Sequence, residues 1–162
     1  MKRLNPLLAA LLLAATSLTA VTAAQAADTA PAPAAAADPL AGARALIADN
    51  KWAAAIAELQ RIDAKGSADW NNLMGYSHRK AKSPDYAAAE RYYDAALALD
   101  PKHRGALEYS GELFLMLGDL PRAEQRLAAL DKACFLPCGE YTDLKNAIAK
   151  FKANGNRVSA QN

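Results

Sequence analysis

The 162-residue sequence has few aromatic residues, only two cysteines and only two histidines. Aromatic residues make up 7% of the chain and β-branched residues are also sparse, which disfavours a β-sandwich or β-barrel. His78 and His103 stand apart from the cysteines, so no spacing typical of a closed metal site occurs. The 19 basic and 17 acidic residues nearly balance, which excludes a strongly basic nucleic-acid-binding surface. We predict no cofactor, no metal site and no nucleic-acid partner.

The sequence patterns of common catalytic sites are also missing. No serine lies in a strand-turn-helix context, no glycine-rich phosphate loop is present, and the carboxylates are scattered along polar helix faces. His78 is expected in the interior or at its edge, whereas His103, two residues after Pro101, is expected to be exposed at the start of a helix. The sequence therefore predicts a protein that is not an enzyme.

An export signal occupies the beginning of the sequence. Residues 1–3 are basic at two positions, residues 7–15 form an apolar run, and residues 24–26 place alanine at both positions that signal peptidase reads. We expect a cleavable signal peptide over residues 1–26 and a periplasmic location. The apolar run is short for a membrane-spanning helix, so no stable membrane insertion is expected after cleavage, and an uncleaved anchor is the alternative. The remaining chain has 17 basic and 17 acidic residues.

Two further segments have the composition of unfolded chain. Residues 27–38 consist almost wholly of Ala, Pro and Asp, and repeated proline prevents a continuous helix, so we expect a disordered tether. Residues 154–162 are rich in Gly, Asn, Ser and Gln and are expected to form a flexible tail. The folded domain is therefore expected over residues 39–153.

Between these segments the sequence repeats every 34 residues. Four positions recur in register over three copies, each within a run of good helix formers. A small residue is followed four residues later by a large one and seven residues later by an apolar one, a spacing that forms a single buried stripe on a helix. The four sets are Trp52, Tyr86 and Leu120; Ala55, Ala89 and Ala123; Leu59, Tyr93 and Leu127; and Ile62, Ala96 and Leu130.

A second, less regular helix precedes this one in each copy. Gly75 and Gly111 mark it in the second and third copies and stand 36 residues apart, because the turn at residues 81–85 is longer than its counterpart in the third copy. Ser83 is the expected N-cap after the longer turn, and Asp119 is the expected N-cap after the shorter one. Each copy is therefore expected to be a helical hairpin.

This pattern resembles the tetratricopeptide repeat family, whose 34-residue unit is a helix-turn-helix with W-x2-L-G-x2-Y, then A-x3-F, then P. Trp70 departs from that pattern, because it stands one residue before the family's tryptophan position, which Asn71 and Leu107 occupy. The first copy also lacks the glycine. The residues that carry the resemblance are Gly75, Gly111, Phe114, Ala55, Ala89, Ala123, Leu59, Tyr93, Leu127 and Pro101.

The resemblance implies an all-α fold, an α-α superhelix or right-handed solenoid of three hairpins at about residues 39–66, 68–101 and 102–133. A further helix at about residues 139–152 has one apolar stripe and is expected to cap the last hairpin, because the end of a solenoid otherwise exposes its interface. Seven helices are predicted. An ordinary antiparallel helix bundle is the alternative.

In this family the first helices of successive hairpins line a concave groove that holds peptide segments. By that resemblance, the chain is interpreted as a non-catalytic periplasmic adaptor that binds an extended segment of another envelope protein. Leu115 and Met116 would mark an interaction surface if they are exposed, whereas burial in the core is the alternative for both. The predicted groove residues are Arg44, Asn72, Tyr76, Arg79, Lys80, Glu108, Glu112, Leu115 and Met116.

Cys134 and Cys138 lie between the third hairpin and the expected capping helix. In an exported protein such a close pair is expected to be oxidised, and we interpret it as a structural disulfide. A thiol-disulfide or redox-linked function is the alternative, because a cysteine near a helix N-terminus has a lowered pKa. Self-association through the ends of the solenoid is a third hypothesis, and it predicts a weak homo-oligomer.

Overall fold

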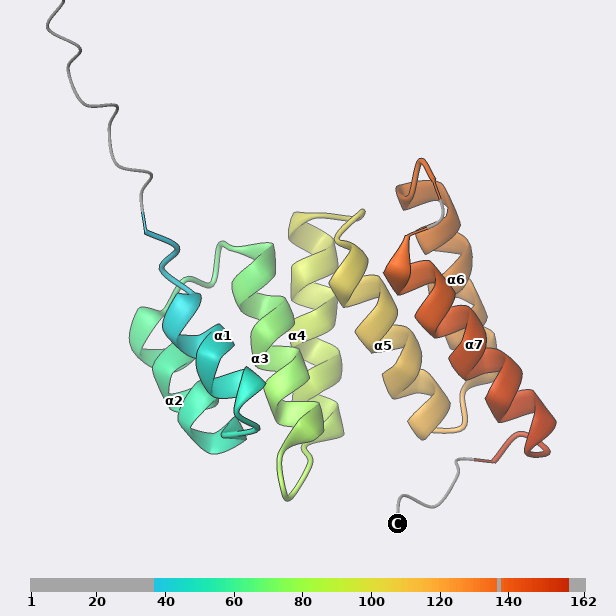
Figure 1. Ribbon diagram of the computed structural model, residues 1–162, viewed down its shortest axis with the longest axis horizontal. Helices are drawn as coiled ribbons and strands as arrows, with labels where there is room; N and C mark the ends of the chain where they lie inside the picture. The colour runs from blue at the N-terminus through green and yellow to red at the C-terminus, as the bar shows by residue number, and fades with distance from the viewer. Residues whose placement is uncertain (1–36, 137, 158–162) are drawn as a thin grey trace, which may run out of the picture. The chain divides into compact units, whose positions relative to one another are not determined.

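The computed structural model describes residues 37–136 and 138–157. Within these ranges it contains seven α-helices and no strand, which confirms the predicted all-α class (Figure 1). The predicted signal peptide, nearly all of the predicted tether and residues 158–162 lie outside the described residues. The helices are α1 (Ala41–Ala48), α2 (Trp52–Ile62), α3 (Ala68–Lys80), α4 (Tyr86–Leu99), α5 (Arg104–Met116), α6 (Leu120–Ala133) and α7 (Gly139–Ala153).

The 34-residue period has a direct structural counterpart. Trp52, Tyr86 and Leu120 are the first residues of α2, α4 and α6, and the alanine three residues further on is completely buried in every copy. α1 packs on α2, α3 on α4 and α5 on α6, so helices adjacent in sequence form the expected hairpins. The recurring small residue therefore lies where two helices of a hairpin approach closely.

Side-chain caps lie at the start of the second helix in the second and third hairpins. The carboxylates of Asp85 and Asp119 each accept a hydrogen bond from the backbone N–H three residues later, at 2.8 and 3.1 Å. The prediction of Asp119 as a cap is confirmed. The prediction that Ser83 caps the second helix of the second hairpin is wrong. That helix, α4, begins at Tyr86, and Asp85 is its cap. An aspartate carboxylate at this position satisfies an N–H group and also interacts favourably with the helix dipole.

Trp70 joins the first hairpin to the second. Its side chain is 2% exposed, its indole Nε1 donates a hydrogen bond to the carbonyl oxygen of Leu59 at 2.7 Å, and its ring meets Tyr92 edge-on with centroids 5.9 Å apart. The tryptophan therefore connects α3 with both α2 and α4. Its displacement by one residue from the family's position does not prevent it from being a core residue.

Gly75 allows α3 and α4 to approach closely. A Cβ atom at this position would lie 2.8 Å from the ring of Tyr93 and 3.1 Å from the carbonyl oxygen of Ala89. Both neighbours are completely buried and have no free space into which to move. The glycine that marks the second copy is therefore required by the packing of its own hairpin.

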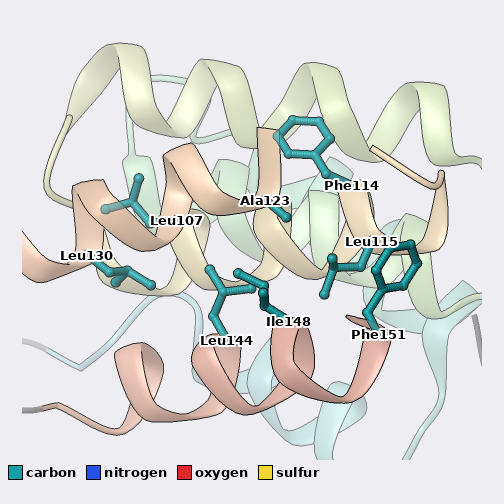
Figure 2. Close-up of a cluster of buried hydrophobic side chains, with 8 residues drawn as sticks. All are labelled: Leu107, Phe114, Leu115, Ala123, Leu130, Leu144, Ile148 and Phe151. Atoms are coloured by element: carbon teal, nitrogen blue, oxygen red, sulfur yellow. The ribbon is translucent and has the colours of Figure 1, made fainter. Parts of the chain in front are cut away.

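α7 covers the last hairpin by packing on both α5 and α6. Figure 2 shows Leu144, Ile148 and Phe151 of α7 pointing toward those two helices. Leu144 is completely buried, and Gly111 of α5 lies so close that a Cβ there would be 2.5 Å from the Leu144 Cδ2 atom. The buried cluster that joins the three helices contains Leu107, Phe114, Leu115, Ala123, Leu130, Leu144, Ile148 and Phe151.

Candidate binding site

A cavity of about 370 Å³ lies between α3, α5 and α7. α5 occupies the middle position, because it contacts α3 on one side and α7 on the other. α3 and α5 contribute residues that the sequence predicted for the groove, and α7 and the segment after it supply the rest of the lining. The cavity is lined by Arg79, Lys80, Glu112, Leu115, Met116, Ala147, Lys150, Phe151, Asn154 and Arg157.

Arg79 is the central polar group beside this cavity. Its side chain is 5% exposed, and its Nη2 donates to the Oε2 atom of Glu112 at 2.7 Å. The guanidinium carbon also lies 5.4 Å from the ring centroid of Tyr76 and 5.5 Å from that of Tyr109, and the two rings are themselves 4.6 Å apart. This buried cation therefore links α3 to α5 through the carboxylate of Glu112 and the ring of Tyr109, and it also lies beside Tyr76 of its own helix.

Tyr109 and the α7 side of the cavity are not among the residues predicted from sequence. A signal for Tyr109 exists, because Tyr109, Glu112 and Met116 follow one another at spacings of three and four and share a helix face. No comparable signal exists for Lys150 in α7. Only the packing of α7 on α5 brings it to the cavity.

Four of the nine predicted groove residues do not line the cavity, namely Arg44, Asn72, Tyr76 and Glu108. Arg44 pairs with Asp38 at 3.2 Å and with Asp69 at 2.9 Å, and it does not line the cavity. Asn72 is 7% exposed and packs at the contact of α3 with α5, where its amide nitrogen would lie 3.0 Å from a Cβ added to Gly105. The structure therefore places Arg44 in surface ion pairs and Asn72 in a contact between two helices.

Leu115 and Met116 form the floor of the cavity and do not make an exposed patch. Leu115 is 6% exposed and belongs to the buried cluster of α5, α6 and α7, so the core alternative is the correct one for it. Met116 is half-buried, and its sulfur lies 3.9 Å from the Nη1 atom of Arg79. α7 covers Leu115. The periodicity of α5 alone does not show which helix packs against this residue.

Glu108 is a buried carboxyl group on α5, with 8% of the residue exposed. Burial and the neighbouring carboxylates of Glu112, Asp143 and Glu140 raise the pKa of Glu108 to about 7, against the opposing effect of Arg79. The folded state therefore favours the protonated form of this group, which ionises only near neutral pH.

Replacing Glu108 by glutamine is expected to stabilise the protein at pH 8 by about 1 to 3 kcal/mol and to change it little at pH 4.5. In the native chain the folded state retains a proton that the unfolded state releases above its own pKa of 4.5, so stability falls as pH rises from 4.5 to about 7. Urea unfolding of both proteins across this range measures the difference. Glu124→Gln at an exposed ion pair is the matched control, and a pH-independent Glu108→Gln effect would contradict the prediction.

His103 is less exposed than the sequence predicts, with a side chain that is only 13% exposed. It is the N-cap of α5, and its Nδ1 accepts a hydrogen bond from the N–H of Ala106 at 3.0 Å, while Nε2 contacts Asp69 at 2.8 Å. The hydrogen bond with His103 lowers the pKa of Asp69, and the nearby charge of Arg44 adds to this effect. The expectation of an exposed imidazole is wrong, because α3 brings Asp69 across to it.

His78 is half-buried, as expected for a histidine at the edge of the interior. Its ring stacks on that of Tyr92 with centroids 5.4 Å apart, and burial lowers the pKa of His78. The imidazole therefore acts as a packing group between α3 and α4.

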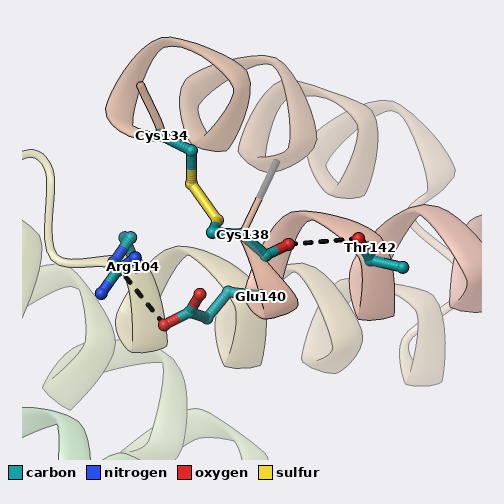
Figure 3. The surroundings of a disulfide bond; sticks show 5 residues. All are labelled: Arg104, Cys134, Cys138, Glu140 and Thr142. Carbon is teal, nitrogen blue, oxygen red and sulfur yellow. Dashed lines mark hydrogen bonds and ion pairs between the residues drawn. A yellow bond between two sulfur atoms is a disulfide. The ribbon is translucent and has the colours of Figure 1, made fainter. Parts of the chain in front are cut away.

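Cys134 and Cys138 form a disulfide that joins the end of α6 to the start of α7 (Figure 3). The carbonyl oxygen of Cys138 accepts a hydrogen bond from the hydroxyl of Thr142 at 3.1 Å, within the first turn of α7. Arg104 of α5 pairs with Glu140 at 3.6 Å. Covalent and polar contacts together fix the N-terminal end of α7.

Replacing both cysteines by serine is expected to lower the free energy of unfolding by about 2 kcal/mol, because a short ring restricts the unfolded chain only modestly. Urea unfolding of the oxidised protein and of the variant measures this loss, and hydrogen exchange should show it first in α7. The redox-linked alternative predicts a different result, namely that the native chain, with its Cys134–Cys138 disulfide first reduced by dithiothreitol, reduces insulin disulfides and is itself reoxidised, whereas the variant does not.

No known family model matches the chain, and no curated protein matches it. Within residues 37–136 and 138–157, none of the helices has both the length and the apolar character needed to cross a bilayer. The same residues contain no group of three His, Cys, Asp or Glu side chains placed to hold a metal ion.

Proposed function

We propose that this chain is a non-catalytic adaptor of the periplasm that binds an extended segment of another envelope protein. In this proposal the three hairpins are tetratricopeptide repeats arranged as a right-handed superhelix, and α7 caps the last of them. The observation that carries the proposal is the cavity between α3, α5 and α7, which combines apolar and charged side chains from three helices.

The packing order of the helices supports a continuous binding surface. α1 contacts α3, α3 contacts α5, and α5 contacts α7, in addition to the contacts within each hairpin. In repeat proteins of this kind, successive units contact only their neighbours and create extended binding surfaces. An extended segment would therefore meet side chains of several helices in succession.

A second hollow beside the main cavity supports the binding of a peptide segment longer than one residue. This hollow has a volume of about 120 Å³ and shares Arg79, Lys80 and Met116 with the main cavity. It continues from those residues to Pro84 and Tyr86 at the start of α4. The two hollows together offer adjacent positions for consecutive side chains of a bound chain.

The disulfide supports an extracytoplasmic location. Disulfides persist in oxidising compartments such as the bacterial periplasm and are rare in the cytosol. A bonded pair at Cys134 and Cys138 agrees with the export signal inferred from residues 1–26.

Site-specific photo-crosslinking in bacterial cells tests the binding function. A photoreactive amino acid at Lys80, which is exposed at the cavity, is expected to give a specific adduct with an envelope protein. Mass spectrometry of the adduct identifies the crosslinked segment. The matched control carries the same amino acid at Gln125, which is exposed on α6 and does not line the cavity. Equal adducts at both positions, or none at Lys80, would contradict the proposal.

A further inference from the structure

The charges around the cavity between α3, α5 and α7 are unequal. Four basic side chains line it against a single carboxylate, that of Glu112, which is already paired with Arg79 at 2.7 Å. The other three cations, Lys80, Lys150 and Arg157, are exposed and have no ion-pair partner within residues 37–136 and 138–157. The cavity therefore has three positive charges available to a ligand.

The floor between these cations is apolar. Leu115 and Phe151 are 6% and 5% exposed, and Met116 and Ala147 beside them are half-buried. A bulky apolar side chain placed on this floor would gain about 25 cal/mol for each Å² of apolar surface removed from water. Positive charge and apolar floor thus occur within one cavity of about 370 Å³.

From this combination we infer that the segment bound at the proposed site is acidic, with a bulky apolar side chain flanked by carboxylates. The apolar side chain lies on the floor formed by Leu115, Met116 and Phe151. The carboxylates pair with Lys80, Lys150 and Arg157. This inference rests on the proposed function and specifies the chemistry of its partner.

The lining favours a peptide over an anionic lipid. Apart from its four apolar residues, every residue that borders the cavity is charged or polar, so an acyl chain would leave the apolar floor after a short distance. The adjoining hollow leads to Tyr86, and Tyr76 and Tyr109 lie together beside Arg79. Aromatic side chains with a polar tip suit peptide contacts, since one part is apolar and the other forms hydrogen bonds.

Fluorescence anisotropy with designed peptides tests the inference on the oxidised protein. The probe is a fluorescein-labelled decapeptide of glycine and serine with a central phenylalanine flanked by two glutamates. One matched peptide replaces the glutamates by lysines, and another replaces the phenylalanine by serine. The acidic phenylalanine peptide is expected to bind about ten-fold more tightly than either. Its binding should weaken between about 50 and 500 mM salt, because exposed charges are screened.

Charge-reversed variants locate the binding. Lys80→Glu and Lys150→Glu are each expected to weaken binding of the acidic peptide about ten-fold, while circular dichroism shows an unchanged helix content. Lys102→Glu is the matched control, because Lys102 is exposed and lies outside the cavity. Vesicles containing phosphatidylglycerol form a separate arm, in which no binding is expected.

Three results would overturn the inference. They are equal affinity for the acidic and basic peptides, an acidic peptide whose affinity is unchanged in both lysine variants, and vesicle binding that both variants abolish. Sequencing of the segment crosslinked at Lys80 separates this inference from the proposed function. A captured segment without acidic residues overturns the inference alone, whereas absence of any specific adduct overturns the proposed function.

Discussion

Leu144→Ala is expected to lower the free energy of unfolding by about 2 to 5 kcal/mol. A value in the upper half of that range follows from complete burial of the side chain and from its position against Gly111 of α5. The substitution leaves a cavity at the centre of the contact by which α7 covers the last hairpin (Figure 2). Urea unfolding followed by circular dichroism measures the loss.

Leu136→Ala is the matched control, because it removes the same atoms from a leucine that is 72% exposed. We expect this control to change stability by less than about 0.5 kcal/mol. Hydrogen exchange in Leu144→Ala should increase in α7 and α5 before it increases in α1 and α2, since contacts between repeats are local. Similar losses for both leucine variants would show that α7 does not depend on this packing.

Arg79→Met is expected to cost about 3 kcal/mol, at the low end of the range for breaking a buried ion pair. The low end applies because the Glu112 side chain is 31% exposed and keeps some hydration. Removing the guanidinium also leaves Glu112 beside Glu108 without a neutralising charge, and it removes the cation beside Tyr76 and Tyr109. The unfolding free energy at pH 8 measures the effect.

The double variant Arg79→Met/Glu112→Leu separates charge from packing. We expect it to recover most of the lost stability, because an apolar pair of similar volume replaces both ionised groups. Arg91→Met is the control, since Arg91 is exposed on α4 and forms no ion pair in the described residues. A double variant that is less stable than Arg79→Met would assign the cost to lost packing around the aromatic rings.

The helical hairpins could be predicted because their determinants are local or strictly periodic. Tyr86 and Leu120 begin their helices 34 residues apart, and Asp119 caps the second of these helices as expected. The expected cap Ser83 is not the one used, because α4 begins later in the chain and Asp85 caps it. Periodicity identifies a helix reliably, whereas it leaves the first residue open by a few positions.

The candidate site could be predicted only in part. Arg79, Lys80 and Glu112 were expected on the groove face and do border the cavity. Arg44 does not, because it lies on α1, which does not border the cavity, and its guanidinium pairs with Asp38 and Asp69. His103 is less exposed than the sequence predicts, because the carboxylate that covers it comes from α3, a separate helix.

By itself the sequence determined the helical class, the 34-residue period and the apolar stripe of the last helix, because these follow from spacing along one chain segment. Only the tertiary structure decided that α7 covers Leu115, that Arg79 is buried beside two tyrosines and a carboxylate, and that Lys150 borders the same cavity as Lys80. The physical reason is that burial and charge pairing depend on which helix faces meet, and α3, α5 and α7 meet across long separations in sequence. Two of the few aromatic residues of the chain, Tyr76 and Tyr109, lie beside that buried arginine for the same reason.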